Sequence, residues 1–217
     1  MESVPRPARE TSRVEMFSDS VFAIAMTLLG FGLGHPSHGP GPLSTRLIDA
    51  WPSYLAFFTS FVTIGIVWIN HHRLFTHILR ISHGLLLWNG LLLMFVTLIP
   101  FTSGLVADSI GRDDARTAAG LYSAGFVLTT MSFNLLWRHA TRHRRLLDRH
   151  VTPAMVHRIN LQYGFGPLFY LATFAVAVAG GALASMLLNC VLAVFFALPA
   201  FTLADAVLET PGDDVSG

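Results

Sequence analysis

The sequence contains no lysine, a single cysteine and few charged residues of either sign. Charged residues make up 12% of the chain, whereas a soluble globular domain carries roughly 25%. The formal net charge of +1 excludes a strongly charged nucleic-acid-binding protein. The single cysteine, Cys190, excludes both a disulfide framework and a cysteine-based zinc site. The sequence also lacks a GxSxG motif and a glycine-rich phosphate loop, so nucleophilic catalysis has no support.

The sequence is instead rich in long apolar stretches. Hydrophobic residues form 53% of the 217 residues, and the mean hydropathy is +0.55. A membrane-spanning helix needs about 20 apolar residues. Six such stretches can be found, at about residues 14–33, 48–69, 81–106, 115–137, 161–179 and 182–208. Gly180 and Gly181 separate the last two. The sequence therefore predicts an all-α, polytopic membrane protein with six transmembrane helices in a single domain, residues 1–217.

The arginines are distributed unequally between the two predicted sides of the membrane. Eleven of the fourteen fall on the side of the N-terminus, and Arg46, Arg112 and Arg116 fall on the other. Because cytoplasmic loops carry an excess of positive residues, both termini are predicted to be cytoplasmic. The use of arginine alone indicates a G+C-rich genome, so the expected location is the plasma membrane of a bacterium.

Asp19 is a carboxylate about one turn inside the first apolar stretch. One interpretation is a helix-start residue, because the helix dipole and free N–H groups stabilise a carboxylate in the first turn. The other is a buried polar node that fastens the first helix to its neighbours. Partners at similar predicted depth are Trp68, Asn70, His71, His72 and Asn89.

A different face of the first predicted helix carries a mainly apolar stripe. Its members recur at helical spacing and are Phe17, Ser20, Ile24, Thr27, Leu28 and Phe31. Such a stripe is typical of contact with lipid or with a protein core. Thr27 is its only polar member at mid-membrane depth, and Arg13 falls on the same stripe nearer the N-terminus.

Four histidines raise the alternative of a metal site, because imidazoles are common zinc and iron ligands; they are His71, His72, His77 and His83. Adjacent histidines, however, point to different faces of a helix. No intramembrane carboxylate lies close to them in the sequence to complete a site. The prediction is a protein that holds no metal and is not an enzyme.

Three segments in the first half of the chain resemble one known family. Arg13-x-x-x-Phe17-Ser18-Asp19, followed by an apolar helix, resembles the signature that opens the repeat of the transmembrane protein 175 family of potassium channels. Residues 68–75, WINHHRLF, are similar to the end of that family's second helix, and residues 89–101 are similar to its third helix. The last three predicted helices match the family only in hydropathy.

The resemblance implies a homotetramer in which the first helices surround a central pore, with potassium ions as the permeant species and no cofactor. Counted from the Phe-Ser-Asp motif, the family's apolar constriction falls at Ile24, Leu28 and Phe31, and its threonine layer falls at Thr27. These positions lie on the stripe that periodicity identifies. The family signature and the expected helix-docking network comprise Arg13, Phe17, Ser18, Asp19, Trp68, His71, His72 and Asn89.

The predicted function is therefore a potassium-preferring cation channel that is closed by a hydrophobic constriction. Membrane lipid, potassium ions and further copies of the chain are its expected partners. A proton-coupled secondary transporter remains an alternative, although such proteins usually show internal repeats or broken helices. A membrane metalloenzyme with histidine ligands is a further alternative, which metal analysis of the purified protein would test.

Overall fold

The computed structural model describes residues 6–33 and 41–208, whose regular structure is helical. The helices are α1 (Arg6–Leu28), which continues as the 3-10 helix η1 (Leu29–Leu33), α2 (Leu43–Asp49), α3 (Trp51–Phe75), α4 (His83–Ser109), α5 (Ala115–Arg142), the 3-10 helix η2 (Arg144–Leu146), α6 (Pro153–Gly164), α7 (Gly166–Val178) and α8 (Ala182–Leu208).

Among the described residues, five helical segments are long and apolar enough to cross a membrane. They are Glu10–Leu33, Trp51–Phe75, His83–Ser109, Ala115–Arg142 and Pro153–Val178. The apolar stretch Ala182–Ala197 opens a further helix, α8. The chain is therefore an all-α, multi-pass membrane protein.

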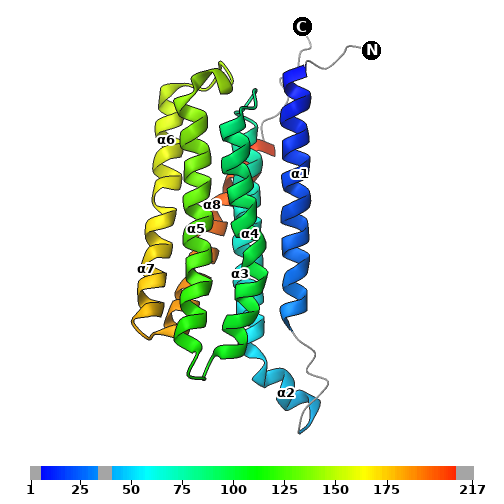
Figure 1. Cartoon of the computed structure of the whole chain (residues 1–217), viewed down its shortest axis with the longest axis vertical. Helices are drawn as coiled ribbons and strands as arrows, with labels where there is room; N and C mark the ends of the chain where they lie inside the picture. Colours follow the sequence, from blue (N-terminus) through cyan, green and yellow to red (C-terminus); the bar gives the residue numbers. More distant parts are fainter. Residues whose placement is uncertain (1–5, 34–40, 209–217) are drawn as a thin grey trace.

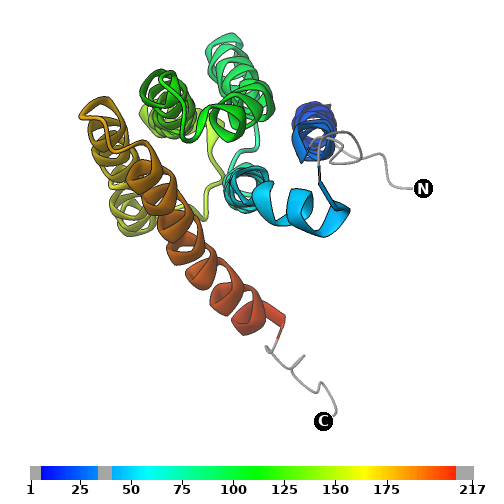
Figure 2. The same cartoon turned by 90° about the horizontal axis from the view of Figure 1, so that it is seen from below.

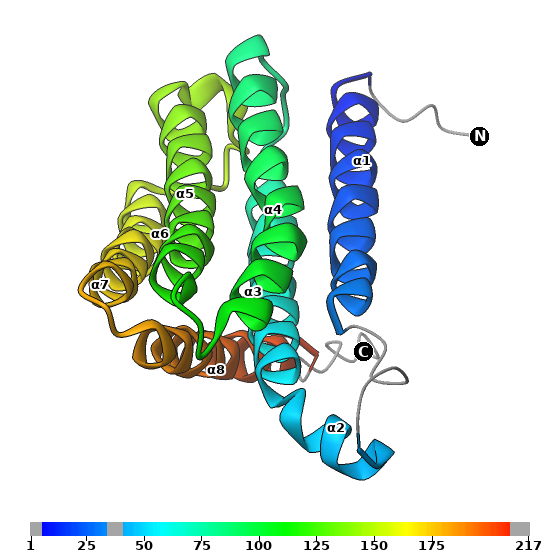
Figure 3. The same cartoon turned by 60° about the horizontal axis from the view of Figure 1, so that its bottom comes forward.

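The long helices stand side by side and alternate in direction along the chain (Figure 1). α4 and α5 form an extensive antiparallel contact, and α3, α7 and α8 pack around them. α1 lies at one edge against α3 and α4, on the opposite side of the molecule from α7 (Figure 2). α8 slants across α3, α5 and α7 instead of standing parallel to them (Figure 3).

The second helical region differs from the predicted stretch 48–69. α2 ends at Asp49, and Pro52 lies in the first turn of α3, where a missing N–H costs nothing. α3 then continues to Phe75, six residues beyond the end of the apolar stretch. Tertiary packing explains this longer helix, because His71, Leu74 and Phe75 are all buried in the bundle.

The fifth helical region starts earlier than the predicted stretch 161–179 and is interrupted. α6 begins at Pro153, and the hydroxyl of Thr152 accepts a hydrogen bond from the Met155 amide at 3.3 Å. Phe165 separates α6 from α7, whose first turn contains Pro167, a residue without an N–H to continue the preceding helix. After α7 the chain turns at Gly180, which adopts a φ of +103° that favours glycine.

Buried polar side chains link the helices behind α1. Ser60 of α3 lies 2.9 Å from the Tyr122 hydroxyl of α5 and donates to Ser103 of α4 at 3.2 Å. At the next residue of α5, Ser123 lies 2.9 Å from Ser185 of α8, and Asn189 of α8 donates to Ser123 at 3.0 Å. Because apolar helices in lipid gain little from the hydrophobic effect, such bonds and close packing hold them together.

Candidate functional site

The two faces of α1 have opposite environments. Ser18, Phe22, Ala25 and Leu29 are buried, and they follow one another at intervals of four, three and four residues. This spacing keeps them on one side of the helix. They form the docked face of α1, which packs on α3 and α4.

The exposed face of α1 is the stripe that periodicity identifies. Phe31 is 81% exposed, Ile24 is 56% exposed and Leu28 is 42% exposed. Phe17, Ser20 and Thr27 are exposed as well, and so is Arg13. The chain thus presents an apolar strip along α1 and its continuation η1, with Thr27 inside the strip and Arg13 beyond its end.

The hydroxyls on the exposed face are bonded within the helix. Thr27 donates to the Ile24 carbonyl at 2.8 Å, and Ser20 donates to the Met16 carbonyl at 2.9 Å. In this geometry the hydrogen of each hydroxyl points back to the backbone. The lone pairs of each oxygen remain available to accept a hydrogen bond or to contact a cation.

Two polar pairs join α1 to α3 in antiparallel register. The indole Nε1 of Trp68 donates to Oδ1 of Asp19 at 2.9 Å, and Nδ1 of His72 lies 2.6 Å from Oε1 of Glu15. Each helix contributes residues four apart, which lie on one helical face. The two pairs therefore fix both the rotation and the vertical position of α1 against α3.

A third contact joins α1, α4 and α3 through buried side chains. The Asn89 amide donates to the Ser18 hydroxyl at 3.0 Å, and its oxygen lies 2.9 Å from Nε2 of His71. The Ser18 hydroxyl donates in turn to the Val14 carbonyl at 2.8 Å. Because the Asn89 oxygen can only accept, these bonds place the proton of a neutral His71 on Nε2. The His71 ring stacks on Phe75 and meets the edge of Phe22, with centroid distances of 4.4 and 5.4 Å.

Comparison with known proteins identifies the family. The sequence profile described as "Endosomal/lysosomal potassium channel TMEM175" matches residues 13–100. The chain is also 44% identical over 192 residues to a potassium channel of Chamaesiphon minutus, with 87% of this chain and 94% of that protein covered. The chain belongs to the TMEM175 family.

Further relatives in the TMEM175 family extend the likeness to most of the chain. A potassium channel of Streptomyces collinus is 39% identical over 170 residues, which cover 77% of this chain and 82% of that protein. The crystal structure of a TMEM175 homolog from Chamaesiphon minutus, titled a lysosomal potassium-selective channel, has a TM-score of 0.77 and 42% identity. It covers 88% of this chain and 98% of that one. The resemblance seen in the motifs is confirmed, and these relatives are ion channels, not enzymes.

The residues predicted from the TMEM175 motifs fall into separate groups in the structure. Asp19 accepts a hydrogen bond from Trp68, whereas Asn89 bonds both Ser18 and His71. Asn70, expected as another partner of Asp19, accepts a hydrogen bond from the Tyr163 hydroxyl of α6 at 3.3 Å. The reason is helical geometry, because residues 68 and 72 share one face of α3 while residues 70 and 71 point to other neighbours.

Sequence reasoning missed Glu15 as a member of the network. The available signal was its spacing, since Glu15 and Asp19 are four residues apart on one helix, as Trp68 and His72 are on the other. Phe17 and Arg13, which belong to the signature, are exposed, in agreement with their positions on the stripe that periodicity identifies. His71 and His72 face different partners, and the described residues contain no group of three or more His, Cys, Asp or Glu that could hold a metal ion.

The Trp68–Asp19 bond is expected to contribute measurably to the docking of α1. A double-mutant cycle of Trp68→Phe and Asp19→Ala, read from reversible unfolding in mixed detergent, should give a coupling energy of about 1 kcal/mol. The pair is partly exposed, which keeps the expected value modest. The interpretation of Asp19 as a helix-start residue is wrong, because α1 begins at Arg6 and Asp19 is its fourteenth residue. Trp88→Phe on α4, combined with Asp19→Ala, is the matched control and should be additive. Additivity of the Trp68 and Asp19 changes would show that the bond does not dock the helix.

Proposed function

We propose that the chain is a potassium-preferring cation channel whose pore is lined by α1 in a homotetramer. The observation that carries the proposal is the exposed face of α1, an apolar strip on a helix whose opposite face is fixed by directional polar bonds. Potassium channels among the relatives support the choice of ion. In a tetramer with rotational symmetry, the same strip from each copy faces the common axis.

The constriction consists of Ile24, Leu28 and Phe31 from each copy. Branched and aromatic side chains at successive turns leave no polar group on which a hydrated ion can exchange its water. A narrow apolar ring excludes water and so raises the barrier to ion passage, which closes the pore. Widening of the ring, by rotation or displacement of α1, rewets it and permits conduction.

Thr27 supplies the polar layer between Ile24 and Leu28. Its hydrogen is directed to the Ile24 carbonyl at 2.8 Å, so the oxygen presents lone pairs away from the backbone. A ring of such oxygens replaces part of the hydration shell of a potassium ion. Sodium holds its water more tightly and gains less from the exchange, which gives a preference for potassium.

The proposed topology places both termini in the cytoplasm and the channel in the plasma membrane of a bacterium. α8, Ala182–Leu208, serves as the sixth membrane pass and returns the chain to the side on which α1 begins. The arginine-rich loop after α5 and the start of α1 then lie on the cytoplasmic side, as the positive-inside rule requires. Glu15 and Asp19 lie near the inner mouth and fasten the pore helix there.

The reversal potential in a planar bilayer tests this function. With opposed potassium and sodium gradients and symmetric chloride, we expect the current of the wild-type protein to reverse near the potassium equilibrium potential. Thr27→Ala should lower the potassium-to-sodium permeability ratio by about threefold or more, because the hydroxyl ring is lost. Ser20→Ala removes a hydroxyl from the same face outside the constriction and should leave the ratio unchanged.

Two results would count against the proposal at different levels. An unchanged permeability ratio in Thr27→Ala would remove Thr27 from the selectivity layer and leave the channel in place. No current from inserted, folded wild-type protein would overturn the channel itself. In that case, slow saturable flux in liposomes would identify a carrier instead.

A further inference from the structure

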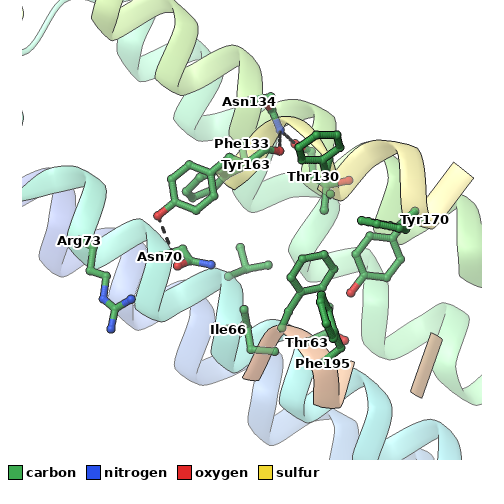
Figure 4. Close-up of a pocket in the computed structure, with 15 residues that line it drawn as sticks. Thr63, Ile66, Asn70, Arg73, Thr130, Phe133, Asn134, Tyr163, Tyr170 and Phe195 are labelled. Carbon is green, nitrogen blue, oxygen red and sulfur yellow. Dashed lines mark hydrogen bonds between the residues drawn. The ribbon is translucent and has the colours of Figure 1, made fainter. Parts of the chain in front are cut away.

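A cavity of about 610 Å³ lies in the bundle on the other side of α3 from α1. Its walls come from α3, α5, α6, α7 and α8, and Figure 4 shows the side chains that line it. Its volume is within the range of about 300–1,000 Å³ that small-molecule sites occupy. The lining residues are distinct from the exposed face and the docking network of α1.

One end of the cavity is polar. Arg73 and Asn70 of α3 lie there, and the Tyr163 hydroxyl donates to the Asn70 side chain at 3.3 Å (Figure 4). Asn134 of α5 donates to the Tyr163 carbonyl at 2.9 Å, which ties α6 to α5 next to the break at Phe165. This end combines a positive charge with amide and phenol groups.

The other end of the cavity is apolar and aromatic. Phe169, Tyr170, Phe195 and Phe196 of α7 and α8 line it, and their rings contact one another, with centroid distances of 6.1 Å for Phe169–Phe196 and 6.4 Å for Tyr170–Phe196. Phe165, Phe169 and Phe195 are exposed at the protein surface. The cavity wall therefore reaches the outer surface of the bundle at apolar residues.

The length of the cavity matches one leaflet of the bilayer. Its wall on α3 extends from Thr63, the midpoint of the helix, to Arg73, two residues from the helix end. Ten residues of α-helix rise about 15 Å, which is half of the roughly 30 Å hydrocarbon core. The polar end thus lies at headgroup level and the aromatic end at the membrane centre.

The polar end also lies at the arginine-rich end of the molecule. Arg80 follows α3, and Arg144 and Arg145 follow α5, whose C-terminal end lies on the same side as that of α3 (Figure 1). Positive side chains at this level attract anionic headgroups. A ligand with a negative head and a long apolar tail therefore matches the cavity in charge, polarity and length.

We propose that the cavity binds one acyl chain of an anionic phospholipid from the leaflet at the arginine-rich end. The phosphate lies at Arg73, the ester region lies beside Asn70 and Tyr163, and the tail lies among the phenylalanines. This assignment does not depend on conduction, so it stands or falls separately from the channel proposal.

Native mass spectrometry of the delipidated protein, titrated with palmitoyl-oleoyl phosphatidylglycerol or the matching phosphatidylcholine, tests the site. We expect phosphatidylglycerol to bind more tightly, and Arg73→Gln to weaken its binding by about fivefold. Arg138→Gln, a change at an exposed arginine near the same end of α5, should have little effect. Thr130→Phe, which fills the cavity from α5, should weaken the binding of both lipids by about tenfold.

Leu128→Phe is the matched control for the filling variant, since Leu128 is exposed on α5 outside the cavity. It should bind both lipids like the wild type. Unchanged lipid binding in folded Thr130→Phe would overturn the site, and equal affinity for the two headgroups would overturn the role of Arg73. A change of oligomeric state in Thr130→Phe without a change in lipid binding would show that a second copy of the chain covers the cavity, which also overturns the proposal.

Discussion

Replacing Ile24 with asparagine is expected to raise the potassium conductance of the unstimulated protein by about tenfold or more. Ile24 is 56% exposed on the face of α1 that points away from the bundle, so the substitution leaves the docked face intact. An amide at this position can hold water in the constriction, and a wetted constriction presents a lower barrier to a hydrated ion. A tenfold rise corresponds to about 1.4 kcal/mol of barrier, which is modest for a ring of amides.

Single-channel recording and potassium flux from liposomes measure this change. Leu121→Asn is the matched control, because Leu121 is an apolar residue of similar exposure, 50%, on α5, whose main contacts are with α4 and α7. It should leave the basal current at the wild-type level. An Ile24→Asn protein that folds, assembles and conducts no more than the wild type would remove Ile24 from the gate.

Replacing Asn89 with leucine is expected to destabilise the protein more than any other single change in the docking network. Asn89 is buried and bridges Ser18 of α1 and His71 of α3 at 3.0 and 2.9 Å. Leucine leaves the buried Nε2–H of His71 without an acceptor, which costs about 2 kcal/mol. For a chain of this size, such a loss corresponds to a fall in melting temperature of about 5 °C.

The double variant Asn89→Leu with His71→Phe distinguishes a lost hydrogen bond from a packing defect. Phenylalanine keeps the ring between Phe22 and Phe75 and removes the polar atom that lost its partner. Replacing both partners with apolar groups is close to neutral, so the double variant should regain most of the melting temperature. A double variant that is less stable than Asn89→Leu alone would show that Asn89 acts through shape and not through its amide.

The faces of α1 could be predicted from sequence because they depend on one helix alone. A repeat of 3.6 residues assigns Ile24, Thr27 and Leu28 to one side, and the structure leaves that side exposed. For the hydrogen-bond partner of Asp19, the sequence predicts only a group of candidate side chains at a similar depth in the membrane. To identify Trp68 as the partner, one must know which face of α3 points toward α1. That orientation is fixed by the burial of His71 and Phe75.

The cavity could not be predicted from sequence because its walls lie far apart in the chain. Asn70 and Tyr163 are separated by 93 residues, and neither belongs to a motif that marks a ligand. The break between α6 and α7 could not be predicted either, because it lies within the apolar stretch 161–179, which hydropathy predicts as one continuous helix. Gly166 and Pro167 are local signals for it, but only packing against α5 places Tyr163 over Asn70.

Among the described residues, the side-chain hydrogen bonds between α1 and its neighbours lie from the sixth to the fourteenth of its 23 residues. Thr11 donates to the Leu79 carbonyl at 3.3 Å, and the bonds of Glu15, Ser18 and Asp19 follow within two turns. Beyond them, Phe22, Ala25 and Leu29 dock through apolar surface, which has no preferred direction. The constriction residues therefore lie beyond the polar anchor, on the half of the helix that is held by apolar packing. Ser18 and Phe31 are about 20 Å apart along the helix, so a tilt of a few degrees about the anchor moves the ring of Phe31 by an ångström or more.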